Sequence, residues 1–297
     1  MSDSKPSAPA PTVDTSAIRQ IASGVWVIPD HRVPLVPNIG IVVGDHSALV
    51  IDTGTGIKNG RAVLEVARRL AGDRKLILTL THFHPEHGYG AQPFKGVAKI
   101  VYNRSQALEL ADKGQSYLEM FKGMGPAIAE ALEGTELVAA DELYDGPLHE
   151  IDLGGRVVQL RNWGKAHTRG DQIVFLPAER ILFTGDLAEE KTFPIFPWFP
   201  PHDADIDGAN WLRALDDCIA MKPEIVVPGH GELGGVDIII GVRDYIAAMA
   251  QSVRDELKRV SEEELVAELA PRIRAQYPDW HFPEWIDFAI RYHASLV

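Results

Sequence analysis

The sequence predicts an α/β protein in which two β-sheets are layered between helices. Short β-rich apolar runs alternate with amphipathic segments of helical period, in the order strands, helix, strand, helix, strands, helix, strand. This order favours two sheets with mixed connections. The chain has 297 residues, 45% of them hydrophobic, so it can bury a sizeable core as one large or two medium domains. The composition is not that of a fibre, a repeat array or a disordered chain.

The first half of the chain begins with a small, polar and Pro-rich segment, residues 1–20, which we expect to be a flexible tail. Strands separated by turn-forming residues are then predicted at 25–29, 39–43 and 48–51. Residues 58–70 suit a helix with one apolar face. The run 76–80 is continuously apolar, as is typical of a strand covered on both faces, and it leads directly into the sequence THFHPEHGYG.

The second half begins with a helical pattern over 104–133, which Gly123, Gly125 and Pro126 must interrupt. A second β-rich part follows, with a helix near 208–221 before its last strand. Its strands are predicted at 149–153, 156–162, 172–176, 181–184 and 224–227.

The C-terminal part is predicted to be helical. Ser261 followed by Glu264 indicates a capping box ahead of an apolar-periodic stretch. Residues from Pro283 onward, rich in Trp, Phe, Ile and Tyr, predict a last helix packed on the body or on a second subunit. We therefore expect one domain over residues 21–235 and a helical extension over residues 236–297 that packs on it.

Charge and cysteine content exclude several classes of function. The formal net charge is −13 and no basic run occurs, so no nucleic-acid partner is expected, because phosphate binding needs clustered Lys and Arg. No apolar stretch is long enough to span a membrane, and the N-terminus lacks the apolar core of a secretory signal. We expect a cytoplasmic location, with the periplasm as the alternative if a native leader was removed. The single cysteine, Cys218, excludes an intramolecular disulfide and is expected to be a buried, inert thiol.

Five of the eleven histidines fall in three short segments, each just after a predicted strand. The first segment holds three imidazoles and a carboxylate: His82, His84, Glu86 and His87. Because alternate residues of an extended chain point the same way, these side chains can converge on a metal ion. The alternative is a set of solvated loop histidines, which the presence of the other two segments disfavours.

The other two segments supply His167, in the loop after 156–162, and His230, directly after 224–227. Between them the strand 181–184 ends in Gly185-Asp186. A lone histidine after a strand is more often a hydrogen-bonded structural residue, so each signal alone is weak. Together and in this order they predict a metal site.

This series of motifs, HxHxxH, a GxxH loop, GD and then PGH, resembles the metallo-β-lactamase superfamily. The turn Asp52-Thr53-Gly54 resembles that family's early DTG turn, and the resemblance covers roughly residues 21–235. It implies a four-layer αββα sandwich with metals at one edge of the sheets, followed here by extra C-terminal helices. It also implies a hydrolase in which two close metals share a water and lower its pKa.

The resemblance also implies a role for each site residue. His82, His84 and His167 would hold a first metal, Glu86, His87 and His230 a second, with Asp186 bridging both and Asp52 supporting the ligands from behind. Nitrogen and oxygen donors at open positions suit one or two Zn²⁺ ions, with Fe or Mn as alternatives where carboxylates are numerous.

Glu86 departs from the family pattern, which usually has Asp at this position. The longer side chain either displaces the second metal or reaches it from a different direction. An alternative interpretation makes Glu86 a catalytic base or water-orienting group beside a single zinc. Glu86 and Asp186 are therefore the predicted catalytic carboxylates.

An aromatic, Pro-rich segment, residues 189–203, follows Asp186 and cannot form a regular helix or a central strand. One interpretation is an apolar wall that selects an apolar or aromatic small molecule. The wall would consist of Phe193, Phe196, Trp198 and Phe199, with His202 as a proton donor. The alternative is a packed irregular loop or an interface, as in a homodimer.

The leading functional hypothesis is hydrolysis of a carbonyl bond in an ester, thioester, lactone or amide, β-lactams included. A bridging Asp186 without a cysteine ligand resembles the glyoxalase II and lactonase branches rather than lactamases that use cysteine. Redox chemistry at a single iron, as in persulfide dioxygenases, is the second hypothesis, and the complete second ligand set argues against it. A phosphodiesterase or nuclease is the third, and the acidity of the chain disfavours it.

Overall fold

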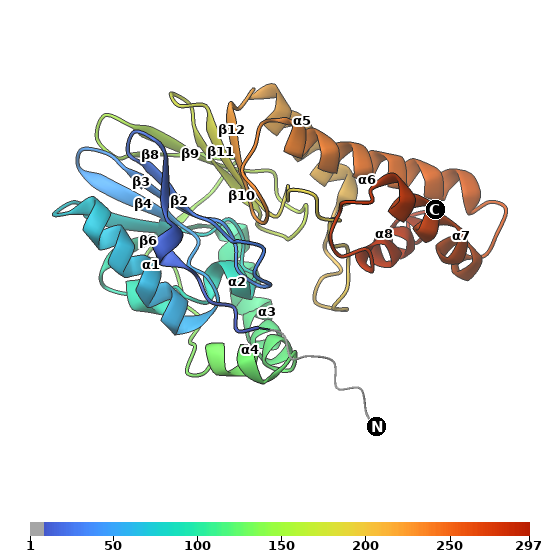
Figure 1. The fold of residues 1–297 in the computed structure, drawn as a ribbon, viewed down its shortest axis with the longest axis horizontal. Coiled ribbons are helices and arrows are strands. Elements are labelled where there is room, and N and C mark those ends of the chain that lie inside the picture. Colours follow the sequence, from blue (N-terminus) through green and yellow to red (C-terminus); the bar gives the residue numbers. More distant parts are fainter. Residues whose placement is uncertain (1–8) are drawn as a thin grey trace.

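Two mixed sheets stack face to face in the computed structural model of the chain, which describes residues 9–297 (Figure 1). The first is seven-stranded with the order β1-β2-β3-β4-β5-β6-β7. Strands β1 to β4 pair antiparallel, and β4 to β7 pair parallel. Its strands are β1 (Arg19–Ala22), β2 (Val25–Ile28), β3 (Ile39–Val43), β4 (Ser47–Ile51), β5 (Lys75–Thr79), β6 (Ala98–Asn103) and β7 (Glu142–Tyr144).

The second sheet is five-stranded with the order β12-β11-β10-β9-β8. Neighbours in it are antiparallel except β11 and β12, which run parallel. Its strands are β8 (Leu148–Asp152), β9 (Val157–Asn162), β10 (Gln172–Leu176), β11 (Ile181–Gly185) and β12 (Ile225–Pro228). Strands β9, β11 and β12 therefore run in the same direction.

Helices cover the outer face of each sheet (Figure 1). On the side of the first sheet lie α1 (Gly56–Ala71), α2 (Pro85–Gly88), α3 (Arg104–Lys122) and α4 (Pro126–Ala131), with short 3-10 turns η1 (Thr15–Ala17) and η2 (Gln92–Phe94). On the side of the second lie α5 (Gly208–Ala220), α6 (Asp237–Glu256), α7 (Glu262–Gln276) and α8 (Trp285–Ala294).

Strand alternation divides the core into three apolar layers. In β4, Ala48 and Val50 face the helices of the first side, whereas Leu49 and Ile51 face the second sheet. In β10, Ile173 and Phe175 face helices α5 to α8, whereas Val174 and Leu176 face the first sheet. Both central strands are buried on both faces, which confirms the predicted α/β sandwich of two sheets between helices.

The predicted helices and strands have close counterparts in the structure, with three strands as exceptions. The helical pattern over 104–133 divides into α3 and α4 at the predicted glycines, and α7 begins with the capping box of Ser261 and Glu264. Strands β1, β6 and β7 were not predicted, because β1 and β7 are short edge strands and β6 carries polar residues among its apolar ones. Cys218 is fully buried, and burial raises the pKa of its thiol to about 12.

The structure differs from the expected N-terminal tail at residues 13–20. Val13 is buried in the first core layer, and its backbone amide donates to Asn59 Oδ1 at 3.0 Å. Strand β1 then starts at Arg19 and pairs with β2. Residues 1–8 of that predicted tail lie outside the described residues. Within residues 9–297, no helix has the length and apolar character needed to cross a lipid bilayer.

The C-terminal helices pack directly on the second sheet. Ile246 of α6, Leu269 of α7 and Ile290 of α8 belong to the same buried layer as Leu182 of β11. Part of the loop that follows β11 also packs in this layer, and the same loop carries Asp186.

Candidate metal centre

All the predicted ligands lie just beyond the C-terminal ends of strands, at one edge of the sandwich. Residues 82–87 follow β5 of the first sheet, whereas His167, Asp186 and His230 follow β9, β11 and β12 of the second. Because these three strands run in the same direction, their C-terminal ends meet at the same edge. The loop at this edge is tightly packed: a Cβ on Gly229 would collide with Asp186 Oδ1, so only glycine fits there.

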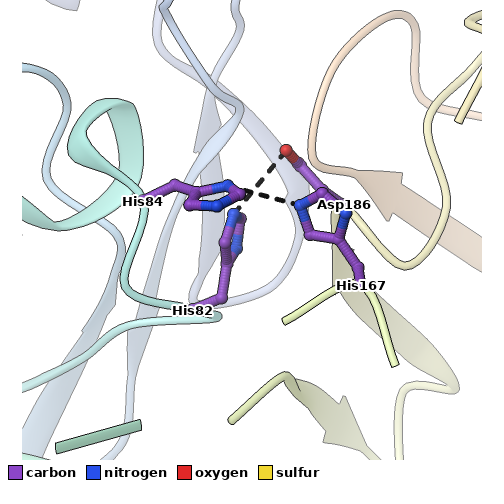
Figure 2. A group of neighbouring side chains, drawn as sticks. All are labelled: His82, His84, His167 and Asp186. Atoms are coloured by element: carbon purple, nitrogen blue, oxygen red, sulfur yellow. Dashed lines mark hydrogen bonds and ion pairs between the residues drawn. The ribbon is translucent and has the colours of Figure 1, made fainter. Parts of the chain in front are cut away.

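The first group of side chains consists of His82, His84, His167 and Asp186 (Figure 2), all buried. Each offers one ligand atom, and these atoms lie within 4.8 Å of one another. His82 Nε2 is 3.7 Å from Asp186 Oδ2, and His167 Nε2 is 3.3 Å from His84 Nδ1. Figure 2 shows the three imidazoles and the carboxylate converging on a common point.

The second group consists of Glu86, His87, Asp186 and His230, whose ligand atoms also lie within 4.8 Å of one another. His87 Nε2 is 3.2 Å from Asp186 Oδ1, and His230 Nε2 is 3.8 Å from Asp186 Oδ2. Asp186 therefore belongs to both groups, as a bridging ligand must. Glu86 lies in the short helix α2. Its side chain is one methylene longer than that of Asp, and its carboxylate still lies among the donor atoms of the second group.

The donor atoms fit metal ions because they lack other partners. His82 Nε2, His87 Nε2, Glu86 Oε2 and Asp186 Oδ1 are buried and have no hydrogen-bond partner among residues 9–297. Burying such atoms without partners is costly, so a convergent set of them indicates a cation site. Two groups of nitrogen and oxygen donors sharing one carboxylate match the chemistry of a two-metal site.

The electrostatics of the site favour ligation by neutral imidazoles. Burial and the neighbouring imidazoles hold the pKa values of His82 and His84 well below the usual range. Burial likewise lowers the pKa of His167 to about 4. Although burial opposes it, the surrounding imidazoles hold the pKa of Asp186 well below its usual value. A cation in the first group therefore meets neutral nitrogens and an ionised carboxylate at neutral pH, which is the state that binds metal.

Asp52 supports the ligands from behind rather than joining them. Its Oδ2 is 2.9 Å from His87 Nδ1, and its two oxygens also accept from the backbone amide and the hydroxyl of Thr81. Despite burial, the carboxylates of Asp186 and Asp52 hold the pKa of His87 well above its usual value. Other ligands are held by packing: Tyr117 stacks on His84 with ring centroids 5.2 Å apart.

An apolar cavity of about 330 Å³ opens over the two groups. His84, Glu86, Asp186 and His230 form its floor. Its walls are mostly apolar: Val33, Pro34, Leu35, Phe121, Met124, Ile195, Trp198, Phe282 and Trp285. A cavity of this size and lining suits a small molecule with a large apolar part.

The predicted aromatic wall is only partly present in this cavity. Trp198 lines it, but Phe193 and Phe196 are fully buried under the C-terminal helices. Phe199 packs edge-on against Tyr117, and His202 lies against Phe199 and lines a separate surface pocket rather than this cavity. The packed-loop alternative thus describes Phe193 and Phe196, because a Pro-rich loop has no periodicity from which side-chain directions can be predicted.

Several residues near the site were not predicted. Glu189 is buried, lines the cavity, and has its pKa raised well above the usual value by burial and by Asp186. Arg32 lines the mouth and forms an ion pair with Glu190. Phe282 and the neighbouring Trp285 come from the C-terminal extension. No local signal marks these positions, since each reaches the cavity through tertiary contacts.

The comparisons with known proteins agree with this geometry. A linear primary-alkylsulfatase from Pseudomonas sp. is 23% identical over 77% of this chain and 49% of its own length, so the chain spans about half of that relative. A type 2 metallo-beta-lactamase from Bacteroides fragilis is 28% identical over 73% of this chain and 78% of its own length.

The fold is also shared with solved structures. A stereoselective inverting sec-alkylsulfatase from Pseudomonas sp. superposes with a TM-score of 0.71 at 16% identity, covering 94% of this chain and 50% of that one. The family model of the metallo-beta-lactamase superfamily matches residues 32–230, which contain every predicted ligand. The chain therefore belongs to the metallo-beta-lactamase superfamily.

Proposed function

We propose that this chain is a metal-dependent hydrolase that cleaves an ester-type carbonyl bond in a small molecule with an uncharged apolar part. The observation that carries the proposal is the position of the two donor groups, which share Asp186, at the floor of an apolar cavity. Esters, thioesters, lactones and amides, β-lactams included, all place a polar reacting bond beside a less polar body.

The donor set supports zinc, with iron or manganese as alternatives. His82, His84 and His167 with Asp186 would hold one ion, and Glu86, His87 and His230 with Asp186 a second. A cation bound there supplies water of lowered pKa and polarises the bond under attack. The complete second group favours this chemistry over that of a mononuclear iron dioxygenase.

The remaining residues would position the substrate and exclude water. Ile195 and Trp198 from the loop after Asp186 cover one side of the floor, so the apolar body of a substrate would displace water there. Arg32 is the one Lys or Arg that lines the cavity among the described residues, and Glu190 already neutralises it. A substrate with an uncharged body therefore fits better than one with a second anionic group.

An alkyl sulfate ester is the second candidate, favoured by one observation. The sec-alkylsulfatase fold covers 94% of this chain and so includes most of the C-terminal extension, whereas a metallo-beta-lactamase structure covers 80% of the chain. Most of the extension that supplies Phe282 and Trp285 to the cavity is thus matched in a protein named for an alkyl substrate.

Metal analysis of the purified protein, coupled to a substrate panel, tests the proposal. The panel contains p-nitrophenyl esters, thioesters, lactones, nitrocefin, an alkyl sulfate and a phosphodiester, each also assayed with His84→Ala. We expect bound zinc and zinc-dependent turnover of carbonyl substrates that His84→Ala lacks. Turnover of the sulfate alone would select the second candidate, and turnover of none, with zinc bound, would refute both.

A further inference from the structure

Residues 281–285 reach the mouth of the cavity although they lie outside the family-matched region, residues 32–230. The amide of His281 donates to Lys191 O at 2.8 Å, and the amide of Phe193 donates to His281 O at 3.2 Å. These bonds fix the segment to the loop that follows Asp186. The C-terminal extension is thus attached to the strand end that carries the shared ligand.

Phe282 has an unusual conformation for a surface residue. Its φ is +57°, a left-handed value that is unfavourable for a bulky side chain, and its side chain is 40% exposed. Its ring stacks on Trp285 with centroids 4.4 Å apart and planes within 11° of parallel. Trp280, not Phe282, anchors the segment in the core, against Phe193 and Tyr245. The fold therefore does not require the Phe282 ring, and strained residues of this kind cluster at functional sites.

Met124, which follows α3, also lines the cavity and is 41% exposed. Phe121 and Trp198 lie beside it, with ring centroids 6.4 Å apart. A methionine adapts its shape to different apolar partners, so it suits the contact surface of a flexible ligand. Exposed apolar side chains from the segment after α3 and from the C-terminal extension thus line the same cavity as the donor groups.

We propose that Phe282 and Trp285, together with Met124 and Trp198, form the subsite that binds the uncharged alkyl or aryl group of the substrate. The C-terminal extension then sets the chain-length selectivity of the enzyme. The selectivity for a substrate rests on the proposed function, whereas the binding of an apolar group at this subsite does not. All four side chains are apolar, and the one Lys or Arg that lines the cavity among residues 9–297 is ion-paired. The same cavity is lined by the donor residues His84, Glu86, Asp186 and His230.

The variant Phe282→Gly tests the subsite, because glycine adopts φ +57° without strain while the whole side chain is removed. In zinc-loaded protein, we expect the ratio of kcat/KM for p-nitrophenyl octanoate over acetate to fall about tenfold. Leu108→Ala is the matched control, since Leu108 is exposed on α3 and does not line the cavity. Its ratio should equal that of wild type.

A binding measurement separates this inference from the proposed function. Saturation-transfer NMR with octan-1-ol and butan-1-ol reports occupancy of the subsite without turnover. If no ester is hydrolysed but octan-1-ol binds wild type and binds Phe282→Gly more weakly, the proposed function fails and the subsite stands. An unchanged ester ratio in a folded Phe282→Gly, or octan-1-ol binding equal in the two proteins, overturns the subsite.

Discussion

The carboxylate of Asp52 and the imidazole of His87 are joined over 2.9 Å, between Oδ2 and Nδ1. The contact places the proton of His87 on Nδ1 and leaves Nε2 directed at Asp186, 3.2 Å away. A carboxylate behind a ligating histidine fixes its tautomer and raises its basicity. Asp52 therefore acts on the metal centre through another residue.

Asp52→Asn should weaken metal binding by about 10- to 100-fold, because the amide orients His87 without the negative charge. Asn also tolerates the left-handed φ of +66° at this position, so the backbone should not change. Competition with a chromogenic chelator measures the affinity, and Asp152→Asn, an exposed site in β8, is the control. Equal affinities in wild type and Asp52→Asn would remove this role.

His84→Ala and His167→Ala should each abolish turnover while far-UV circular dichroism stays close to that of wild type. Both side chains lie in loops beyond strand ends and converge on the first group rather than joining the sheets. His46→Ala, at an exposed position, should keep full activity. Near-normal activity with native metal content in either ligand variant would show that the site is assigned wrongly.

The second metal should leave before the first. The His230 side chain is 19% exposed and that of His82 only 1%, so water and chelators reach the second group more readily. Titration with a chelator should release metal in two steps, and Glu86→Asp should shorten the carboxylate's reach and tighten the second step. Release of both ions together, or a second step unchanged in Glu86→Asp, would make Glu86 an equivalent ligand.

Phe196→Ala should lower stability and Trp198→Ala should raise KM, although both residues belong to one predicted wall. Phe196 is fully buried, so its truncation should cost about 3–5 kcal/mol of stability. Trp198 lines the cavity and is only half-buried, so its truncation should raise KM for bulky substrates and change stability little. Denaturant unfolding and steady-state kinetics on both variants check this. Similar stability losses in the two would contradict it.

The stability of the metal-free protein should fall in acid partly through His293. Burial, followed by the charge of Arg254, lowers its pKa to about 4 from the ordinary value of 6.5. Because the folded pKa is depressed, the unfolded chain takes up the proton first, and stability is lost as the pH falls from 6.5 towards 4.

Between roughly pH 7 and pH 4.5, the free energy of unfolding should fall by about 2 kcal/mol less in His293→Gln than in wild type. Urea unfolding in a chelator at both pH values gives the difference, and the other buried histidines cancel in it. An equal loss of unfolding free energy in the two proteins would mean that His293 is already solvated in the folded state.

Strand-end residues were predictable from sequence because their position follows from local patterns. His82, His167, Asp186 and His230 each follow an apolar run, and the sandwich brings the ends of those runs to one edge. Strand periodicity and the order of the motifs predicted a metal site, and the resemblance to the metallo-β-lactamase superfamily supplied the role of each ligand.

Side-chain directions in irregular segments could not be predicted in this way. Phe193 and Trp198 lie five residues apart in one Pro-rich loop, yet one enters the core and the other the cavity. Phe282 reaches the site only because His281 pairs with the loop after Asp186. These outcomes depend on long-range contacts, which leave no trace in a single sequence.

The donor groups draw on both sheets, since His82 and Glu86 follow the first sheet whereas His167, Asp186 and His230 follow the second. Ions held there would join the two halves of the sandwich by coordination, beyond the apolar layer between them. Ligand binding to the folded state alone adds about 2.7 kcal/mol of stability when the free ligand is a hundredfold above its dissociation constant. Bound metal would therefore make the chain more resistant to unfolding and to proteolysis of its unfolded form, independently of any reaction it performs.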